Sequence, residues 1–294
     1  MDGVLVIRKE KGYTSHDVVA RLRGILKQKK IGHTGTLDPD AEGVLPVCLG
    51  RATRAVGLLT DRDKTYRAVL RLGMTTDTQD ISGRVLQTQP VLLTEEEVCA
   101  AAEGFLGAQQ QIPPMYSALK VNGQKLCDLA RQGIEVERAP RPVYFHEIRI
   151  LSMKLPEVEL EITCSKGTYI RTLCHDIGEK LGCGGCMAQL TRTRAGRFSL
   201  EDALTLEEVR NLLYEERLEE KILDIETIFE DNPRILCSFA ADRLLHNGNP
   251  LPQDCVRETH KDGDVRMCDS SGAFVGIYRW EEEKHMYFLK KMFY

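Results

Sequence analysis

The stretch IGHTGTLDPDAEGVLPVCLGRATR, residues 31–54, decides how the rest of the chain can be interpreted. It contains four glycines, which are too many for a helix to run through it. The segment 44–49 is too apolar for a solvated linker. The pattern therefore indicates a fixed loop, and Asp38 lies in its middle, directly before a proline.

Asp38 has two interpretations at this point. Pro39 disfavours a helical conformation at Asp38, and an aspartate at this place is typical of the start of a turn. Alternatively, the neighbouring glycines permit a close approach, which would bring the carboxylate against a substrate. The local pattern alone favours the turn.

The chain has 294 residues, 42% of them hydrophobic, so it can bury one large core and a smaller second one. No stretch approaches the roughly 20 apolar residues that span a bilayer. The ten cysteines are scattered, apart from Cys183 and Cys186, as is typical of free thiols in a reducing compartment. We therefore expect a cytoplasmic protein without a membrane segment.

The net charge of −4 conceals an uneven distribution. The segment 201–231 carries 12 acidic and 3 basic residues, so the remainder of the chain is net positive. Basic residues cluster in 21–33 and again at Arg192, Arg194 and Arg197. This distribution allows a basic face that contacts phosphate, although any single one of these charges is more typical of a solvated surface.

Helix and strand patterns alternate along the chain. Helically spaced apolar residues after a capping pattern predict helices, and strict alternation of apolar residues predicts strands. The helices are expected after Thr14, in 93–105 and in 169–182, and the strands over 65–72 and 158–164.

Arg171 lies in the first turn of the helix expected in 169–182, outside its apolar stripe. The helix dipole opposes a cation at this end, so the residue should have an anionic partner. The alternative is an ordinary surface arginine, and the spacing does not choose between the two.

Two segments depart from the alternating pattern. Prolines and glycines interrupt 109–143, so we expect an excursion from the main body with one short helix at 126–131. From residue 232, short β patterns separated by turns predict a small β domain of about 60 residues.

Other motifs for chemistry are weak or missing. CGGC at 183–186 is a candidate redox or zinc half-site, but no second CxxC accompanies it. There is no GxGxxG after a strand, no P-loop and no GxSxG, so dinucleotide, nucleotide and serine-hydrolase chemistry lack support. We expect neither a metal nor a cofactor.

Several motifs together resemble the TruB family, the tRNA pseudouridine synthases that act on the T arm. The opening stretch carries the family's signature, and further matches follow in the family's order: KGYTSHDVV, DKTYRAVLRLG, TTDTQDISG, QIPPMYSALKVNG, CSKGTYIRTLCHDIG and LTRTRAGRF. The C-terminal β segment resembles more loosely the small RNA-binding PUA-type domain of such enzymes.

The resemblance implies an α+β fold with a mixed, mostly antiparallel central sheet flanked by helices, and a small β-rich PUA-like domain. It implies a catalytic domain at 1–231 and an RNA-binding domain at 232–294, with 109–143 closing over the RNA. The implied reaction isomerises uridine 55 in the T loop of tRNA to pseudouridine after the base is flipped out. We expect a monomer that needs no guide RNA.

The resemblance also gives roles to three residues of the catalytic centre. Asp38 matches the catalytic aspartate, Tyr66 the active-site tyrosine, and Arg171 the arginine that pairs with the aspartate. We expect Arg171 to lower the pKa of Asp38 and so keep the carboxylate ionised at neutral pH.

Three further residues match positions that touch the substrate. His33 matches a histidine that inserts into the T loop, and Tyr169 and Leu190 match residues that border the flipped uridine. Without the resemblance, they would be interpreted as a loop histidine, a strand-edge aromatic and a core leucine.

Two positions depart from the family's pattern. Glu10 follows Lys9 where a proline is usual, and Cys127 replaces a common tyrosine. Both lie outside the matched catalytic set, so they affect the expected loop geometry rather than the activity.

Two alternatives remain open. One is the dyskerin-like branch, which uses guide RNAs, and the DPDAEG motif and the lack of lysine-rich tails argue against it. The other is a tRNA-folding protein without catalysis, against which the intact Asp38, Tyr66 and Arg171 argue.

Overall fold

The computed structural model describes all residues from Met1 to Tyr294. Its main body is built on a nine-stranded sheet with the strand order β1-β3-β12-β4-β11-β10-β7, where β2 pairs with β3 and β13 with β12. The strands are β1 (Gly3–Lys9), β2 (Ile31–His33), β3 (Glu42–Leu49), β4 (Lys64–Leu72), β7 (Gly107–Gln111), β10 (Arg141–Lys154), β11 (Glu157–Cys164), β12 (Gly185–Ala195) and β13 (Phe198–Ser199). Only β3 and β12 pair in parallel, so the predicted mixed, mostly antiparallel sheet is confirmed.

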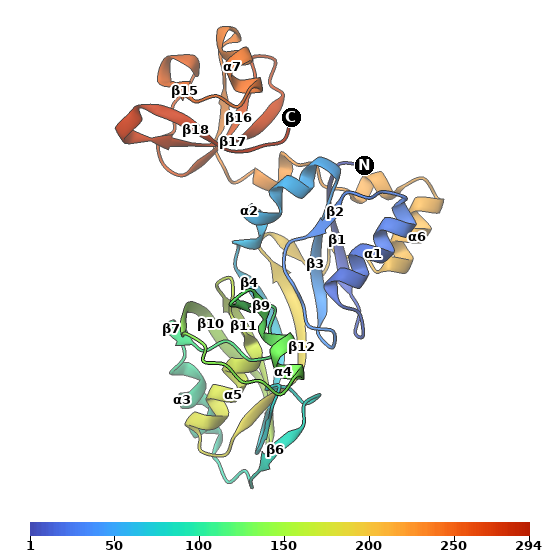
Figure 1. The fold of residues 1–294 in the computed structure, drawn as a ribbon, viewed down its shortest axis with the longest axis vertical. Helices are drawn as coiled ribbons and strands as arrows, with labels where there is room; N and C mark the ends of the chain where they lie inside the picture. The colour runs from blue at the N-terminus through green and yellow to red at the C-terminus, as the bar shows by residue number, and fades with distance from the viewer.

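Helices flank the two halves of this sheet (Figure 1). The helices α3 (Glu95–Glu103) and α5 (Ile170–Lys180) pack together beside β4, β10 and β12. The helices α1 (Ser15–Leu26) and α6 (Leu206–Tyr214) pack against each other and share a core with β1 and β3. The short α2 (Val56–Thr60) leads into β4. None of the helices is both long and apolar enough to cross a membrane.

The periodic segments form the elements that their patterns predict. Helix α1 begins after Thr14, whose side chain and that of Asp17 make a complete capping box, and α3 begins with another at Thr94. The predicted strands are β4 and β11, and the last predicted helix is α5. These segments were predictable because each buries one regular face against the sheet.

The irregular excursion is shorter than predicted. Gln111 pairs with Arg141 and Gln109 with Val143, so both ends of 109–143 belong to strands of the main sheet. The excursion proper is 112–140, with a hairpin of β8 (Lys120–Val121) and β9 (Gln124–Lys125), and the predicted short helix is confirmed as α4 (Leu126–Arg131). The sequence of β7, GAQQQ, gave no strand signal because it lacks apolar alternation.

A second, five-stranded sheet forms the C-terminal part, beyond the α2 end of the main body (Figure 1). Its order is β14-β16-β17-β18-β15, with β14 (Arg234–Leu236), β15 (Leu251–Pro252), β16 (Asp264–Cys268), β17 (Phe274–Glu281) and β18 (Met286–Met292), and α7 (Asp242–His246) lies between its first two strands in the chain. This confirms the predicted small β-rich PUA-like part. Ile277 and Phe293 share an apolar cluster with Val44 and Phe229, which joins this part to the main body.

Gly43 allows the only parallel contact in the main sheet. It lies at the start of β3 with φ of +107°, and a Cβ placed there would be 2.2 Å from the backbone oxygen of Arg192 on β12. At this glycine, the close approach suggested by the sequence is therefore to the protein's own strand and not to a substrate.

We predict that Gly43→Ala lowers the free energy of unfolding by more than about 1 kcal/mol, because alanine is strained at positive φ and its Cβ meets β12. The matched control is Gly24→Ala, at an exposed position in the last turn of α1 with open space for a Cβ, which should stabilise the protein by up to about 0.5–1 kcal/mol. Urea denaturation followed by circular dichroism measures both. Equal stabilities of Gly43→Ala and wild type would contradict the close strand contact.

Candidate active site

Asp38 lies in the loop that connects β2 to β3. Hydrogen bonds hold the backbone of this loop in place on both sides of Asp38. The backbone carbonyl of Asp38 accepts a hydrogen bond from the N–H of Ala41 at 3.1 Å, which closes a turn. Before it, the N–H of Leu37 donates to Ser15 Oγ at 2.9 Å, and the Leu37 side chain is buried in the main core. Asp38 is therefore the start of a turn, as the local pattern favours, and the turn is held rigidly by the fold.

Lys9, the last residue of β1, also holds this loop in place. Its side chain is fully buried, and Nζ donates to the backbone oxygens of Glu10, Pro39 and Ala41. Burial lowers the pKa of Lys9 to about 8, although the charge of Asp38 acts to raise it. Sequence reasoning did not assign this role, because a lysine at a strand end is usually solvated.

Arg171 makes a bidentate ion pair with Asp38. Arg171 Nε lies 3.0 Å from Asp38 Oδ2, and Nη2 lies 3.3 Å from Oδ1. The arginine side chain is 6% exposed and that of Asp38 is 38% exposed, so the carboxylate keeps one open side. The expectation of an anionic partner for this helix-terminal cation is confirmed.

The remaining donors of Arg171 tie two further segments to Asp38. Nη1 donates to the Thr78 carbonyl at 3.1 Å and lies 3.5 Å from Asp80 Oδ2, in the turn between β5 (Met74–Thr76) and β6 (Val85–Thr88). Nη2 also donates to the Tyr116 carbonyl at 2.9 Å, near the start of the excursion. Sequence reasoning missed Asp80, which lies within the quoted TTDTQDISG motif and had no other signal.

The pKa of Asp38 is raised above its ordinary value, against the expectation from sequence. Burial is the main cause, and the carboxylate of Asp80 adds to it, while Arg171 and Lys9 act to lower the pKa. The sequence argument considered the cation alone and omitted the cost of removing the carboxylate from water. Arg171 therefore limits a rise in the pKa instead of producing a net fall.

Tyr66 lies on β4 beside this loop, in the same core cluster as Leu37 and Leu190. It is only 9% exposed. Burial raises the pKa of its hydroxyl, and the nearby Arg192 acts to lower it. The tyrosine is consequently a neutral, well-packed ring at neutral pH.

Arg192 is buried, so the prediction of a phosphate-contacting face that includes it is wrong. It is 1% exposed, and it donates from Nε to the Val44 carbonyl at 2.7 Å and from Nη2 to the Gly35 carbonyl at 3.2 Å. Arg194 and Arg197, its neighbours in the basic cluster, are exposed. Strict alternation would place Arg192 and Arg194 on the same face, but the pairing of β12 with β4 shifts register between them, and Arg197 lies beyond the end of β12.

The three predicted substrate-contacting residues lie around this centre in different settings. Leu190 is on β12 opposite Ala68 and is nearly buried. Tyr169 is the N-cap of α5, and its backbone N–H and carbonyl both bond to the Gln111 side chain, at 2.8 Å and 3.0 Å. His33 ends β2, where the N–H of Gly35 approaches its Nδ1 at 3.4 Å, and burial lowers its pKa.

The candidate half-site CGGC has no ligand geometry. Nowhere in the chain are three or more His, Cys, Asp or Glu side chains grouped to hold a metal. Cys183 is buried with its Sγ 3.3 Å from the Gly184 carbonyl, and burial raises the pKa of Cys186 to about 11. The Cys186 thiol is therefore protonated at neutral pH, and Cys183 is a buried packing group.

Two family descriptions match consecutive parts of the chain. Residues 23–170 match the N-terminal domain of the TruB family pseudouridylate synthases, and residues 171–230 match the C-terminal domain of tRNA pseudouridylate synthase B. The first match contains Asp38 and Tyr66, and the second begins at Arg171.

Similar curated proteins extend over the full chain. A protein named tRNA pseudouridine synthase B from Lachnoclostridium phytofermentans is 49% identical and covers 100% of both chains. Proteins of the same name from Alkaliphilus oremlandii and Clostridium acetobutylicum are 43% and 44% identical, over 98% and 96% of this chain and 96% and 97% of theirs.

Solved structures with the same fold come from larger assemblies. A chain of a Cbf5-Nop10-Gar1 complex has a TM-score of 0.77 at 27% identity, covering 99% of this chain and 85% of that one. A chain of an H/ACA RNP bound to a substrate RNA has a TM-score of 0.75 at 25% identity, with the same coverage. From these matches and the site described above, the chain belongs to the TruB family and is a tRNA pseudouridine synthase, an isomerase that converts uridine in tRNA to pseudouridine.

Proposed function

We propose that this enzyme isomerises uridine 55 in the T loop of tRNA, with Asp38 as its essential carboxylate. The observation that carries the proposal is the bidentate ion pair between Asp38 and Arg171. It leaves the Asp38 carboxylate partly exposed to solvent, next to the strand that carries Tyr66. The full-length similarity to proteins named tRNA pseudouridine synthase B supports a tRNA substrate.

The reaction explains why one carboxylate suffices. The N1–C1′ bond of uridine breaks, the base turns, C5 bonds to C1′, and the proton on C5 is lost while N1 gains one. Nothing is oxidised, and no atom of the nucleotide is gained or lost overall. A single positioned carboxylate can assist such an exchange by attack on the sugar or the ring, or by removal of a ribose proton.

The target base must leave the T loop before it can meet Asp38. Extruding a nucleotide costs a few kcal/mol, which contacts to the RNA must offset. Tyr66 offers a ring on which the base can stack, and Leu190 and Tyr169 border the same space in our proposal. His33, on the neighbouring loop, is proposed to occupy the gap that the base leaves.

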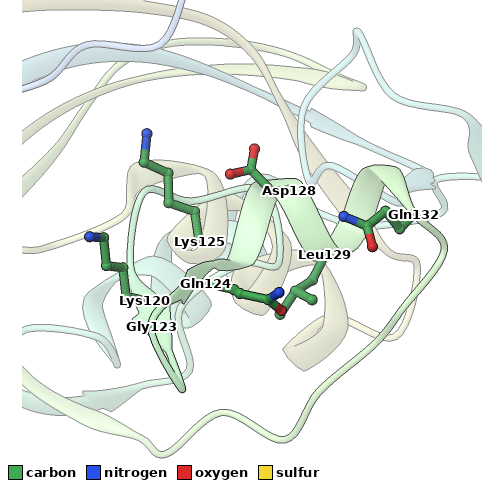
Figure 2. A pocket seen from close by; sticks show the side chains of 7 residues that line it. All are labelled: Lys120, Gly123, Gln124, Lys125, Asp128, Leu129 and Gln132. Atoms are coloured by element: carbon green, nitrogen blue, oxygen red, sulfur yellow. The ribbon is translucent and has the colours of Figure 1, made fainter.

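We assign RNA clamping to the excursion 112–140. Figure 2 shows Lys120 and Lys125 extending from its hairpin, at a pocket of about 390 Å³ that Gln124 and Asp128 also line. The two lysines pair across β8 and β9, so their charges lie together. An exposed pair of ammonium groups on a hairpin outside the main sheet fits a backbone phosphate.

The domain roles are proposals as well. We assign catalysis to 1–231 and RNA binding to 232–294, acting as one monomer without a guide RNA. The apolar cluster shared by the two parts supports a fixed arrangement, in which both bind one tRNA at the same time. Recognition would then depend on the shape of the folded T arm as well as on the loop sequence.

We predict that Asp38→Asn lowers tritium release from 5-tritiated uridine in unmodified tRNA by on the order of 10⁴-fold, because the amide cannot act as the anionic group. Its affinity for tRNA should stay within about threefold of wild type. Asp40→Asn, two residues further on, is the matched control and should retain release. Substantial release by Asp38→Asn would contradict the proposed role.

We predict that Arg171→Met shifts the acid limb of the pH–rate profile to higher pH. The methionine removes the charge that opposes the effect of burial, so the pKa of Asp38 rises further and ionisation needs a higher pH. The rate at pH 7 should fall by about 100-fold. Arg171→Lys keeps a cation and should show a smaller shift, and an unshifted limb in a folded Arg171→Met would contradict the electrostatic role.

We predict that the double variant Lys120→Glu with Lys125→Glu weakens tRNA binding and makes its salt dependence shallower. Losing two phosphate contacts should reduce the slope of log K against log salt by about 1.4–1.8. Lys154→Glu with Lys221→Glu makes the same change of charge on exposed positions away from the hairpin. If both double variants bind alike in filter-binding assays, the clamping assignment fails.

A further inference from the structure

Arg192 is a buried cation without a carboxylate partner. It is the largest fully buried side chain of the protein, and its hydrogen bonds to the Val44 and Gly35 carbonyls involve neutral acceptors only. Arg171, by contrast, is neutralised by Asp38 and Asp80. Burial of an unneutralised guanidinium is costly, so a purely structural role would be served better by a neutral side chain.

The surroundings of Arg192 increase this cost. Burial lowers the pKa of Lys9 and of Lys64 to about 8 each, and the charge of Arg192 acts in the same direction on both. An RNA phosphate cannot compensate the charge, because the residue is 1% exposed. Any contribution of Arg192 to the reaction must therefore act through another group of the protein.

Tyr66 is the group that faces Arg192. The two residues are direct neighbours across β4 and β12, and the charge of Arg192 acts to lower the pKa of the Tyr66 hydroxyl. The other ionisable groups that act on this hydroxyl are Asp38 and the thiol of Cys164, whose pKa burial raises to about 12. Lys64, two residues before Tyr66 on β4, is a second buried cation, and Arg192 is the cation on the paired strand β12.

Arg192 holds the loop that carries Asp38 through two hydrogen bonds. Its Nε and Nη2 donate to the carbonyls of Val44 and Gly35, which flank that loop. One guanidinium thus joins the strand of Tyr66 to the loop of Asp38.

We propose that Arg192 is a positioning residue for the isomerisation: it fixes the loop of Asp38 against the strand of Tyr66 and places a positive charge beside the Tyr66 hydroxyl. This inference rests on the proposed roles of Tyr66 and Asp38 in the reaction.

The test places 2,3,5-trifluorotyrosine at position 66 of the full chain, which brings the phenol into an accessible titration range. The midpoint of the phenol titration is measured by ¹⁹F NMR without RNA. It is compared between otherwise wild-type protein, Arg192→Gln and Arg192→Lys. Arg67→Gln, on the other face of the same strand, is the matched control. Circular dichroism and melting temperature establish that each variant is folded.

We expect the midpoint to move to higher pH in Arg192→Gln, to move less in Arg192→Lys, which keeps a cation, and to stay unchanged in Arg67→Gln. With natural Tyr66, Arg192→Gln should lower kcat by about 100-fold while KM for tRNA changes less than about threefold. An unchanged midpoint in folded Arg192→Gln, or a loss that lies only in KM, would overturn the inference.

The proposed function and this inference fail separately. If Asp38→Asn remained active, the role of Asp38 would be wrong whatever the fluorine titration gave. If Asp38→Asn were inactive and the Tyr66 midpoint did not respond to Arg192→Gln, only the positioning role of Arg192 would be wrong.

Discussion

The ion pair between Asp38 and Arg171 is the contact on which the site depends. Burial alone would favour the neutral acid, and the guanidinium at 3.0 Å opposes this effect. The same arginine reaches the carbonyls of Thr78 and Tyr116, so one side chain joins three loops that are far apart in the sequence. A change at Arg171 would disturb the position of Asp38 as well as its charge.

Buried cations recur around the loop that carries Asp38. Lys9 holds the carbonyls of Pro39 and Ala41, and Arg192 holds those of Gly35 and Val44. Burial opposes each of these charges, and the hydrogen bonds to the loop compensate part of the cost. The result is a loop whose backbone is fixed before the RNA arrives, so binding energy can go into extruding the base and not into ordering the site.

The sequence predicted those features that follow from local periodicity and local electrostatics. Helix α1 and strands β4 and β11 were predictable because regular apolar faces are buried on one side. The partner of Arg171 was predictable in kind, because a cation at a helix N-terminus needs an anion. Its identity as Asp38 came only from the family resemblance, since no local pattern relates residues 133 positions apart.

The features that the sequence did not predict depend on tertiary burial. Lys9 and Arg192 lie in strands as charged residues that are normally solvated, and only the pairing of β3 with β12 encloses Arg192. The direction of the Asp38 pKa shift was wrong because desolvation is invisible in a sequence. The limits of the excursion were wrong because the glutamine-rich β7 is a strand only through its pairing with β10.

The measurement that tests the central claim most directly is a ¹³C NMR titration of the Asp38 carboxyl in the free protein, assigned by comparison with Asp38→Asn. The account predicts a midpoint above the ordinary value of 3.8, with the carboxyl ionised at pH 7. A carboxyl that is still protonated at pH 7 would contradict the account, because Arg171 would then fail to keep the buried group charged.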